Sequence, residues 1–144
     1  MITPYYADKD VCIFHGDSRD ILPHLKGDLV VTSPPYNLNL RVNTKRQFIP
    51  RQCIPEEFST KYNTYSDALQ PEEYLELLYE VLSLSLTTCN RACWNMQVTT
   101  GSKWAMASLL GTFADSFKEL VVWDKGHGQP AMKDRTLNSA FELV

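Results

Sequence analysis

Serine, two prolines and a tyrosine stand together at Ser33-Pro34-Pro35-Tyr36, directly after the run 29–32. The Ser33 hydroxyl and the Pro34 carbonyl are hydrogen-bond acceptors, and the ring of Pro35 biases Pro34 to an extended conformation. Tyr36 adds a flat aromatic face. Two acceptors aimed at the hydrogens of a planar amino group draw its nitrogen toward tetrahedral geometry and free its lone pair. The segment therefore suits chemistry on the amino group of a flat ring.

This motif resembles the catalytic segment of S-adenosylmethionine-dependent DNA amino-methyltransferases, in which Asp, Asn or Ser precedes two prolines and an aromatic residue. The resemblance implies that Ser33, Pro34, Pro35 and Tyr36 are catalytic, and that Ser33 also belongs to the cofactor site. Tyr36 would stack on a base taken out of double-stranded DNA. The methyl group would pass by direct displacement, and positioning and charge stabilisation would supply most of the acceleration.

Serine in the first motif position favours cytosine N4 as the methylated atom, because adenine-N6 enzymes usually carry Asp or Asn there. Adenine N6 is the alternative, and similar motifs also act on amino groups of RNA bases. A Pro-Pro turn with an ordinary exposed tyrosine would explain the same residues without function. The strand before the motif favours function, because open α/β sheets bind ligands at the carboxyl ends of their strands.

An acidic residue after an earlier strand matches a second element of the same family. Phe14-His15-Gly16-Asp17-Ser18 follows the short apolar run 11–14. In similar methyltransferases an acidic residue at this point contacts the adenine of S-adenosylmethionine, so the resemblance assigns Asp17 to cofactor binding. An N-cap on the following helix would explain Asp17 equally well.

Basic residues follow the motif in the stretch 38–70, which has little periodicity. We expect a mobile loop region that faces the DNA, because loops this long inside compact domains are usually functional or mobile. Asn37, Arg41, Lys45 and Arg46 are the predicted DNA contacts; a solvated loop is the alternative. The net charge of −3 and pI near 5.6 are untypical of nucleic-acid binders, so a basic contact surface must be local.

The elements that position these groups alternate between strands and helices. The runs 11–14 and 29–32 predict strands around a helix over 17–25, a βαβ unit with a parallel pair. Further elements are predicted as a helix over 71–88, a strand over 93–98, a helix over 101–113, and strands over 120–123 and 140–144. The last two strands resemble the family's antiparallel pair. We predict an α/β class: a partial Rossmann-like methyltransferase fold with a mainly parallel sheet, helices on both faces and a late antiparallel strand pair.

Helical spacing also predicts which side chains face the core. Leu75, Leu78 and Tyr79 belong to the apolar repeat of the helix over 71–88. Trp104 is expected on the core face of the next helix. Trp123, in the strand over 120–123, is expected in the core rather than in a functional site.

The glycine-rich turn that binds the cofactor in this family, Phe-x-Gly-x-Gly, is absent from the sequence. Gly126-His127-Gly128 follows a strand but lacks the close-packed helix start that such a turn needs.

One permuted order of the family has the catalytic motif first and the glycine-rich part near the carboxyl end. Residues 1–144 are therefore expected to form the amino-terminal catalytic part of one domain. The S-adenosylmethionine site would be incomplete, and the target-recognition region would be absent. A second chain or a missing carboxyl-terminal half would complete the enzyme; a non-catalytic remnant that binds DNA or a partner is the alternative.

Cysteine spacing and hydropathy argue against other classes. Cys89 and Cys93 have three residues between them, not the two of common zinc or redox pairs, which favours buried free thiols over a metal site. No apolar run approaches the roughly 20 residues of a membrane span, and the start lacks a signal-peptide pattern. A cytoplasmic protein is expected.

Overall fold

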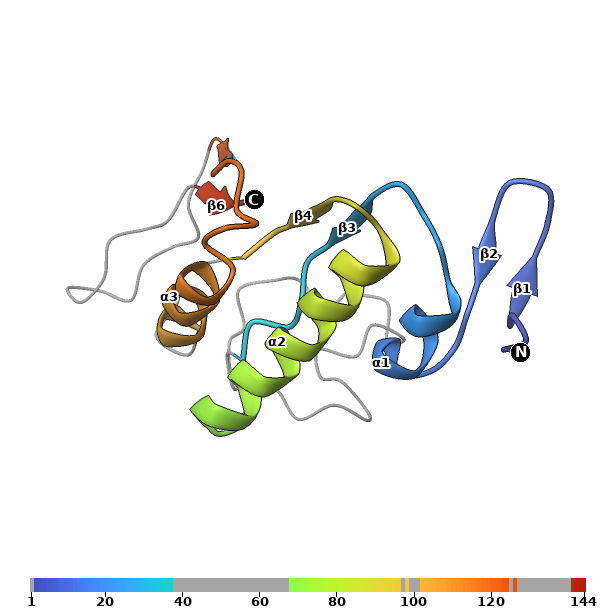
Figure 1. Cartoon of the computed structure of the whole chain (residues 1–144), viewed down its shortest axis with the longest axis horizontal. Coiled ribbons are helices and arrows are strands. Elements are labelled where there is room, and N and C mark those ends of the chain that lie inside the picture. The colour runs from blue at the N-terminus through green and yellow to red at the C-terminus, as the bar shows by residue number, and fades with distance from the viewer. Residues whose placement is uncertain (1, 38–67, 97, 99–101, 125, 127–140) are drawn as a thin grey trace, which may run out of the picture.

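The computed structural model describes residues 2–37, 68–96, 98, 102–124, 126 and 141–144. Short strands and helices alternate along the chain (Figure 1). In chain order they are β1 (Tyr6–Ala7), β2 (Cys12–Ile13), α1 (Ser18–Ile21), the 3-10 helix η1 (Leu22–His24), β3 (Val30–Thr32), α2 (Pro71–Thr88), β4 (Ala92–Trp94), α3 (Lys103–Thr112), β5 (Val122–Asp124) and β6 (Phe141–Leu143). The predicted α/β class is therefore confirmed. Among these elements no helix is long and apolar enough to cross a membrane.

β3 and β4 form a parallel pair in which Thr32 is the partner of Trp94. β5 and β6 form an antiparallel pair, as the sequence predicts. An antiparallel bridge joins the two pairs, because the Met96 N–H donates to the Leu143 carbonyl at 2.8 Å and the Leu143 N–H donates back at 3.0 Å. The strands therefore follow one another in the order β3-β4-β6-β5, and β6 runs against its neighbours.

The predicted parallel pairing between the strand over 11–14 and the strand over 29–32 is wrong. β2 pairs instead with β1 in an antiparallel hairpin. Asp8 closes the hairpin, because its Oδ1 accepts the N–H groups of Asp10 at 2.8 Å and Val11 at 2.7 Å. Figure 1 shows this hairpin at the amino-terminal end of the molecule, beyond α1. The parallel partner of β3 is β4.

α2 has the bounds that the sequence predicts, for local reasons. Pro71 occupies the first turn, where a missing N–H costs nothing. The Gln70 N–H donates to Glu73 Oε2 at 3.3 Å, half of a capping box. At the other end, the Cys89 N–H still reaches the Ser85 carbonyl at 2.9 Å, although Cys89 itself is extended. These contacts fix the helix from residue 71 to residue 88.

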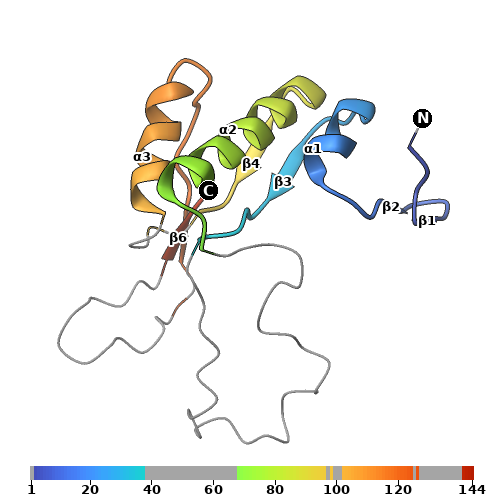
Figure 2. The ribbon, with the colours of Figure 1, turned by 90° about the horizontal axis from the view of Figure 1, so that it is seen from below.

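The core lies between α2, α3 and the adjoining side of β4 (Figure 2). Its buried members are Tyr74, Leu78, Met96, Ala105 and Leu109. Tyr79 and Trp104 were predicted in the core but are 47% and 48% exposed. In α2 the core-facing pair is Tyr74 and Leu78, and Tyr79 is one position beyond it. In α3 the pair is Ala105 and Leu109, and Trp104 is one position before it, so both aromatic side chains are turned away from the core.

The described helices cover one face of β3 and β4. Along each strand the middle residue is exposed and its two neighbours are half-buried, and the middle residues are Val31 and Cys93. Val31 is 74% exposed, and Trp123 of β5, predicted in the core, is 54% exposed. Within the described ranges one pair of strands is parallel, and helices on both faces are not observed.

Candidate functional site

The carboxyl ends of β3 and β4 bring two polar side chains together. Because Thr32 and Trp94 are register partners, the residues that follow them, Ser33 and Asn95, leave the sheet side by side. The Asn95 N–H donates to the Thr32 carbonyl at 2.9 Å and continues the parallel ladder to this point. The predicted strand over 93–98 includes Asn95 in its interior. The observed strand ends at Trp94, so Asn95 belongs to the edge where α/β sheets bind ligands.

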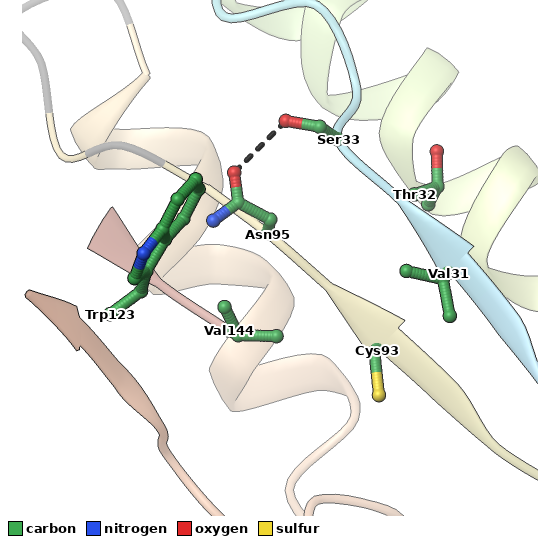
Figure 3. A pocket seen from close by; sticks show the side chains of 7 residues that line it. All are labelled: Val31, Thr32, Ser33, Cys93, Asn95, Trp123 and Val144. Carbon is green, nitrogen blue, oxygen red and sulfur yellow. Dashed lines mark hydrogen bonds between the residues drawn. The ribbon is translucent and has the colours of Figure 1, made fainter. Parts of the chain in front are cut away.

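Three oxygen atoms form a closed hydrogen-bonded triangle at this edge. Ser33 Oγ lies 2.7 Å from Tyr36 Oη and 2.9 Å from Asn95 Oδ1, and Tyr36 Oη lies 2.6 Å from Asn95 Oδ1. Figure 3 shows the Asn95 amide oxygen directed at the Ser33 hydroxyl. The Ser-Pro-Pro-Tyr turn thus folds back so that its first and last side chains meet on Asn95, a residue that sequence reasoning missed.

The carbonyl groups of the two prolines have different partners. The Tyr74 hydroxyl of α2 donates to the Pro35 carbonyl at 2.7 Å, and the Tyr74 side chain is fully buried. Within the residues that the structure describes, no hydrogen bond to the Pro34 carbonyl is found. The buried Tyr74 hydroxyl therefore fixes the second carbonyl of the turn, and the first remains available to a ligand. Helical spacing missed Tyr74 because it precedes the first leucine of the repeat.

Asn37 follows the motif with a positive φ of 55°, a left-handed conformation that asparagine tolerates better than most residues. Its Nδ2 donates to the Leu69 carbonyl at 2.9 Å, and its Oδ1 accepts the Leu69 N–H at 2.8 Å. The amide thus clamps the two ends of the segment between residues 37 and 69. The predicted DNA contacts Arg41, Lys45 and Arg46 lie outside the described residues.

A pocket of about 350 Å³ opens beside the triangle, on the face of the strands that points away from the described helices. Its floor is formed by neighbouring strands, and its polar groups are at the strand ends (Figure 3). The volume is at the lower end of the range for small-molecule sites. The residues that line it are Val31, Thr32, Ser33, Cys93, Asn95, Trp123 and Val144.

Asp17 caps α1, the structural role that its sequence position allows. Its Oδ1 accepts the Arg19 N–H at 2.9 Å, and both carboxylate oxygens accept from the Arg19 guanidinium, at 2.7 Å for the shortest contact. These side-chain hydrogen bonds, followed by the backbone bond, lower the pKa of Asp17 from 3.8 to about 2. Arg19 also reaches Glu80 of α2 at 3.2 Å. The carboxylate is therefore ionised, half-exposed and held by one arginine.

The cysteines that the structure describes are free thiols and differ in their exposure. Cys89 is buried, as predicted, whereas Cys12 and Cys93 are exposed; Cys53 lies outside the described ranges. In the described part of the chain no three His, Cys, Asp or Glu side chains are arranged to hold a metal ion. The hydrogen-bonding groups that this geometry brings together are Ser33, Tyr36, Asn95 and the Pro34 carbonyl.

Comparison with known proteins gives two findings. A family model described as DNA methylase, of the N6/N4 methyltransferase type, matches residues 27–144. The type II methyltransferase M.ScaI of Streptomyces caespitosus is 53% identical over 38 residues. That segment covers 24% of this chain and 12% of the relative, so the match spans a small part of the curated protein.

Proposed function

We propose that the protein containing this chain methylates an exocyclic amino group in double-stranded DNA. The premise is that the chain belongs to the DNA methylase family of N6/N4 methyltransferases. S-adenosylmethionine is the proposed methyl donor, and cytosine N4 is the proposed acceptor in preference to adenine N6. The observation that carries the proposal is the Ser33 hydroxyl. It lies at the carboxyl end of a parallel strand, hydrogen-bonded to Tyr36 and Asn95, beside the Pro34 carbonyl, which accepts no hydrogen bond from the described residues.

Ser33 would act as a hydrogen-bond acceptor for the amino group of the base. A hydroxyl has one hydrogen and two lone pairs, and Ser33 directs its hydrogen at Asn95 Oδ1 or at Tyr36. A lone pair remains for one hydrogen of the amino group, and the Pro34 carbonyl would accept the other. The nitrogen then becomes pyramidal and can attack. As its bond to the methyl carbon formed, the carbon–sulfur bond would break with its electron pair going to sulfur, and the extra proton on the nitrogen would pass to solvent.

Tyr36 would hold the base by its ring. Its hydroxyl is fixed by Ser33 and Asn95, so the ring has a set orientation without contact to a ligand. A base that enters an active site from duplex DNA must leave its neighbours in the stack, and an aromatic face replaces part of that stacking. Fixing the ring in advance lowers the entropy lost when the base binds.

The residues present fit part of a site for S-adenosylmethionine, which supplies an electrophilic methyl group on a sulfonium. The pocket beside Ser33 combines apolar walls from Val31 and Trp123 with polar groups at the strand ends. Asp17 is the proposed adenine contact. Each of its oxygens already accepts two hydrogen bonds from Arg19, so the adenine would have to replace one of them. That exchange is feasible because both side chains are more than 40% exposed.

DNA contacts are proposed for Asn37, Arg41, Lys45 and Arg46, which follow the catalytic segment directly. Lys and Arg neutralise phosphates and release counterions. A second chain or a further segment of the same protein is proposed to complete the fold and cover the exposed face that carries Val31. A sheet needs a packed layer on each apolar face, which supports this proposal.

The base is identified by mass spectrometry of nucleosides from DNA of cells that express the complete protein. N4-methylcytosine is the expected product. Detection of N6-methyladenine would show that adenine is the acceptor, and the proposed amino-methyltransferase activity would stand. Absence of both, together with retained DNA binding, would favour a non-catalytic remnant.

A further inference from the structure

We propose that Asn95 is a positioning residue that makes Ser33 an obligate hydrogen-bond acceptor toward the base. This inference rests on the proposed function, since it concerns the same methyl transfer. Asn95 lies on β4's carboxyl end, outside the Ser-Pro-Pro-Tyr segment, and contacts the reacting groups through Ser33 and Tyr36.

The number of hydrogens within the triangle limits how Ser33 can be oriented. Ser33 Oγ has one hydrogen, and Asn95 Oδ1 has none. With Asn95 Oδ1 at 2.9 Å and Tyr36 Oη at 2.7 Å, the Ser33 hydrogen has two acceptors inside the protein. Because Tyr36 can itself donate to Asn95 at 2.6 Å, Tyr36 keeps a lone pair for Ser33. The Ser33 hydrogen therefore stays inside the triangle, and a lone pair faces the ligand side.

Removal of the Asn95 oxygen changes this arrangement. The Ser33 and Tyr36 hydroxyls carry two hydrogens, and their mutual hydrogen bond uses one of them. Without the Asn95 oxygen, the other hydrogen has no acceptor in the triangle. A Ser33 hydrogen released toward the pocket would meet the hydrogens of the base amino group, donor against donor. Ser33 would then oppose the pyramidal nitrogen that the reaction needs.

The orientation of the amide is set by a neighbouring strand. Asn95 Nδ2 lies 3.4 Å from the Leu143 carbonyl oxygen, a donor facing an acceptor. The adjacent Met96 and Leu143 form a backbone bridge, which keeps that carbonyl at this distance from β4. The flipped amide would direct its oxygen at the Leu143 carbonyl and its donors at Ser33 and Tyr36. Oδ1 therefore faces the two hydroxyls.

The test compares Asn95→Leu, which keeps the size of the side chain without an acceptor, with Asn95→Asp, which keeps an acceptor. Single-turnover methyl transfer is measured with the complete protein, duplex DNA and labelled S-adenosylmethionine. We expect Asn95→Leu to lower the rate at saturation about 10- to 100-fold. This is less than the roughly 100- to 1000-fold loss for removal of a preorganised group that contacts the reacting atoms, because Asn95 acts through Ser33. Asn95→Asp should recover at least part of that loss near neutral pH. Asn90→Leu, the same change at an exposed position after α2, should retain the wild-type rate.

A double-mutant cycle separates positioning from a general structural role. In a Ser33→Ala background the substitution Asn95→Leu should cost much less than in the wild type, since only the contact of Asn95 with Tyr36 remains to be lost. An equal loss in both backgrounds would overturn the inference, and so would a wild-type rate for Asn95→Leu. Asn95→Asp no faster than Asn95→Leu would do the same. If the wild-type protein transfers no methyl group to any DNA, the proposed function fails instead.

Discussion

The buried Tyr74 hydroxyl of α2 donates a 2.7 Å hydrogen bond to the Pro35 carbonyl, in the middle of the Ser-Pro-Pro-Tyr turn. Tyr74 is 0% exposed and packs with Leu78 in the core. The bond thus connects a core side chain of α2 to the segment that carries the proposed chemistry. It also gives the turn a fixed anchor, because a proline in this segment supplies a carbonyl but no N–H.

Tyr74→Phe should destabilise the fold and slow methyl transfer. The substitution removes only the hydroxyl and leaves the Pro35 carbonyl without its partner, which costs about 1–3 kcal/mol of unfolding free energy. Urea unfolding measures the loss of unfolding free energy. The rate of methyl transfer at saturating substrate measures the effect of displacing the turn. Tyr79→Phe on the same helix is the matched control, since Tyr79 is 47% exposed, and it should change stability by less than about 0.5 kcal/mol. Equal effects of the two substitutions would contradict the anchoring role.

Asn37 should contribute to stability through its clamp on Leu69 rather than through its backbone alone. Asn37→Gly keeps the positive φ but loses both side-chain hydrogen bonds, each worth about 1 kcal/mol. Asn37→Ala loses the same bonds and adds the left-handed strain of about 1–2 kcal/mol. We expect the order wild type, Gly, Ala in thermal unfolding. A glycine variant as stable as wild type would show that the clamp contributes nothing.

The ion pair of Asp17 and Arg19 predicts a small, pH-dependent term in stability. Because the pKa of Asp17 is lowered from 3.8 to about 2 in the fold, its contribution is present above the unfolded pKa and is lost as the pH falls toward 2. Asp17→Asn keeps an N-cap residue and removes the charge. Solvent screening limits the loss near neutral pH to less than about 1 kcal/mol. The difference between variant and wild type in urea unfolding should shrink below about pH 4; a constant difference would contradict it.

Replacing Arg41, Lys45 and Arg46 with alanine should reduce the salt dependence of DNA binding. Each phosphate contact contributes about 0.9 to the slope of log K against log salt, so three contacts lower the slope by about 2 to 3. Fluorescence anisotropy with a labelled duplex over a salt series measures it.

A matched set keeps the same change in net charge at exposed sites in other parts of the chain. It replaces the lysines at Lys9, Lys26 and Lys118 with alanine. We expect an unchanged slope for this set. An unchanged slope for the Arg41, Lys45 and Arg46 variant would show a solvated basic loop instead of a DNA contact.

The sequence predicted those parts of the fold that depend on neighbouring residues. α2 has the predicted bounds, because Pro71 and Glu73 act within the first turn. The pairing of β2 was wrong because it depends on a hairpin closed by Asp8, whose turn signal is weaker than the apolar run that follows. The strand over 11–14 was correctly located but was assigned the wrong partner.

The sequence predicted the site residues of the Ser-Pro-Pro-Tyr segment but not Asn95. Ser33 and Tyr36 lie within one short segment, so their types suggest joint chemistry. Asn95 joins them through the parallel register of β3 and β4, a contact between residues 62 positions apart that local patterns do not reveal. A polar residue at the carboxyl end of a strand beside the motif strand is the signal that would have identified it.

The most direct test of the proposed amino-methyl transfer is the position of the transferred methyl group and the dependence of the transfer rate on Ser33. The complete protein is incubated with duplex DNA and S-adenosylmethionine that carries a labelled methyl group, and the nucleosides are separated and identified by mass spectrometry. We predict label on an exocyclic nitrogen, expected at cytosine N4, and a loss of about 100-fold or more in rate for Ser33→Ala with DNA binding retained. Label on a ring carbon, or an unchanged rate for Ser33→Ala, would contradict this proposal.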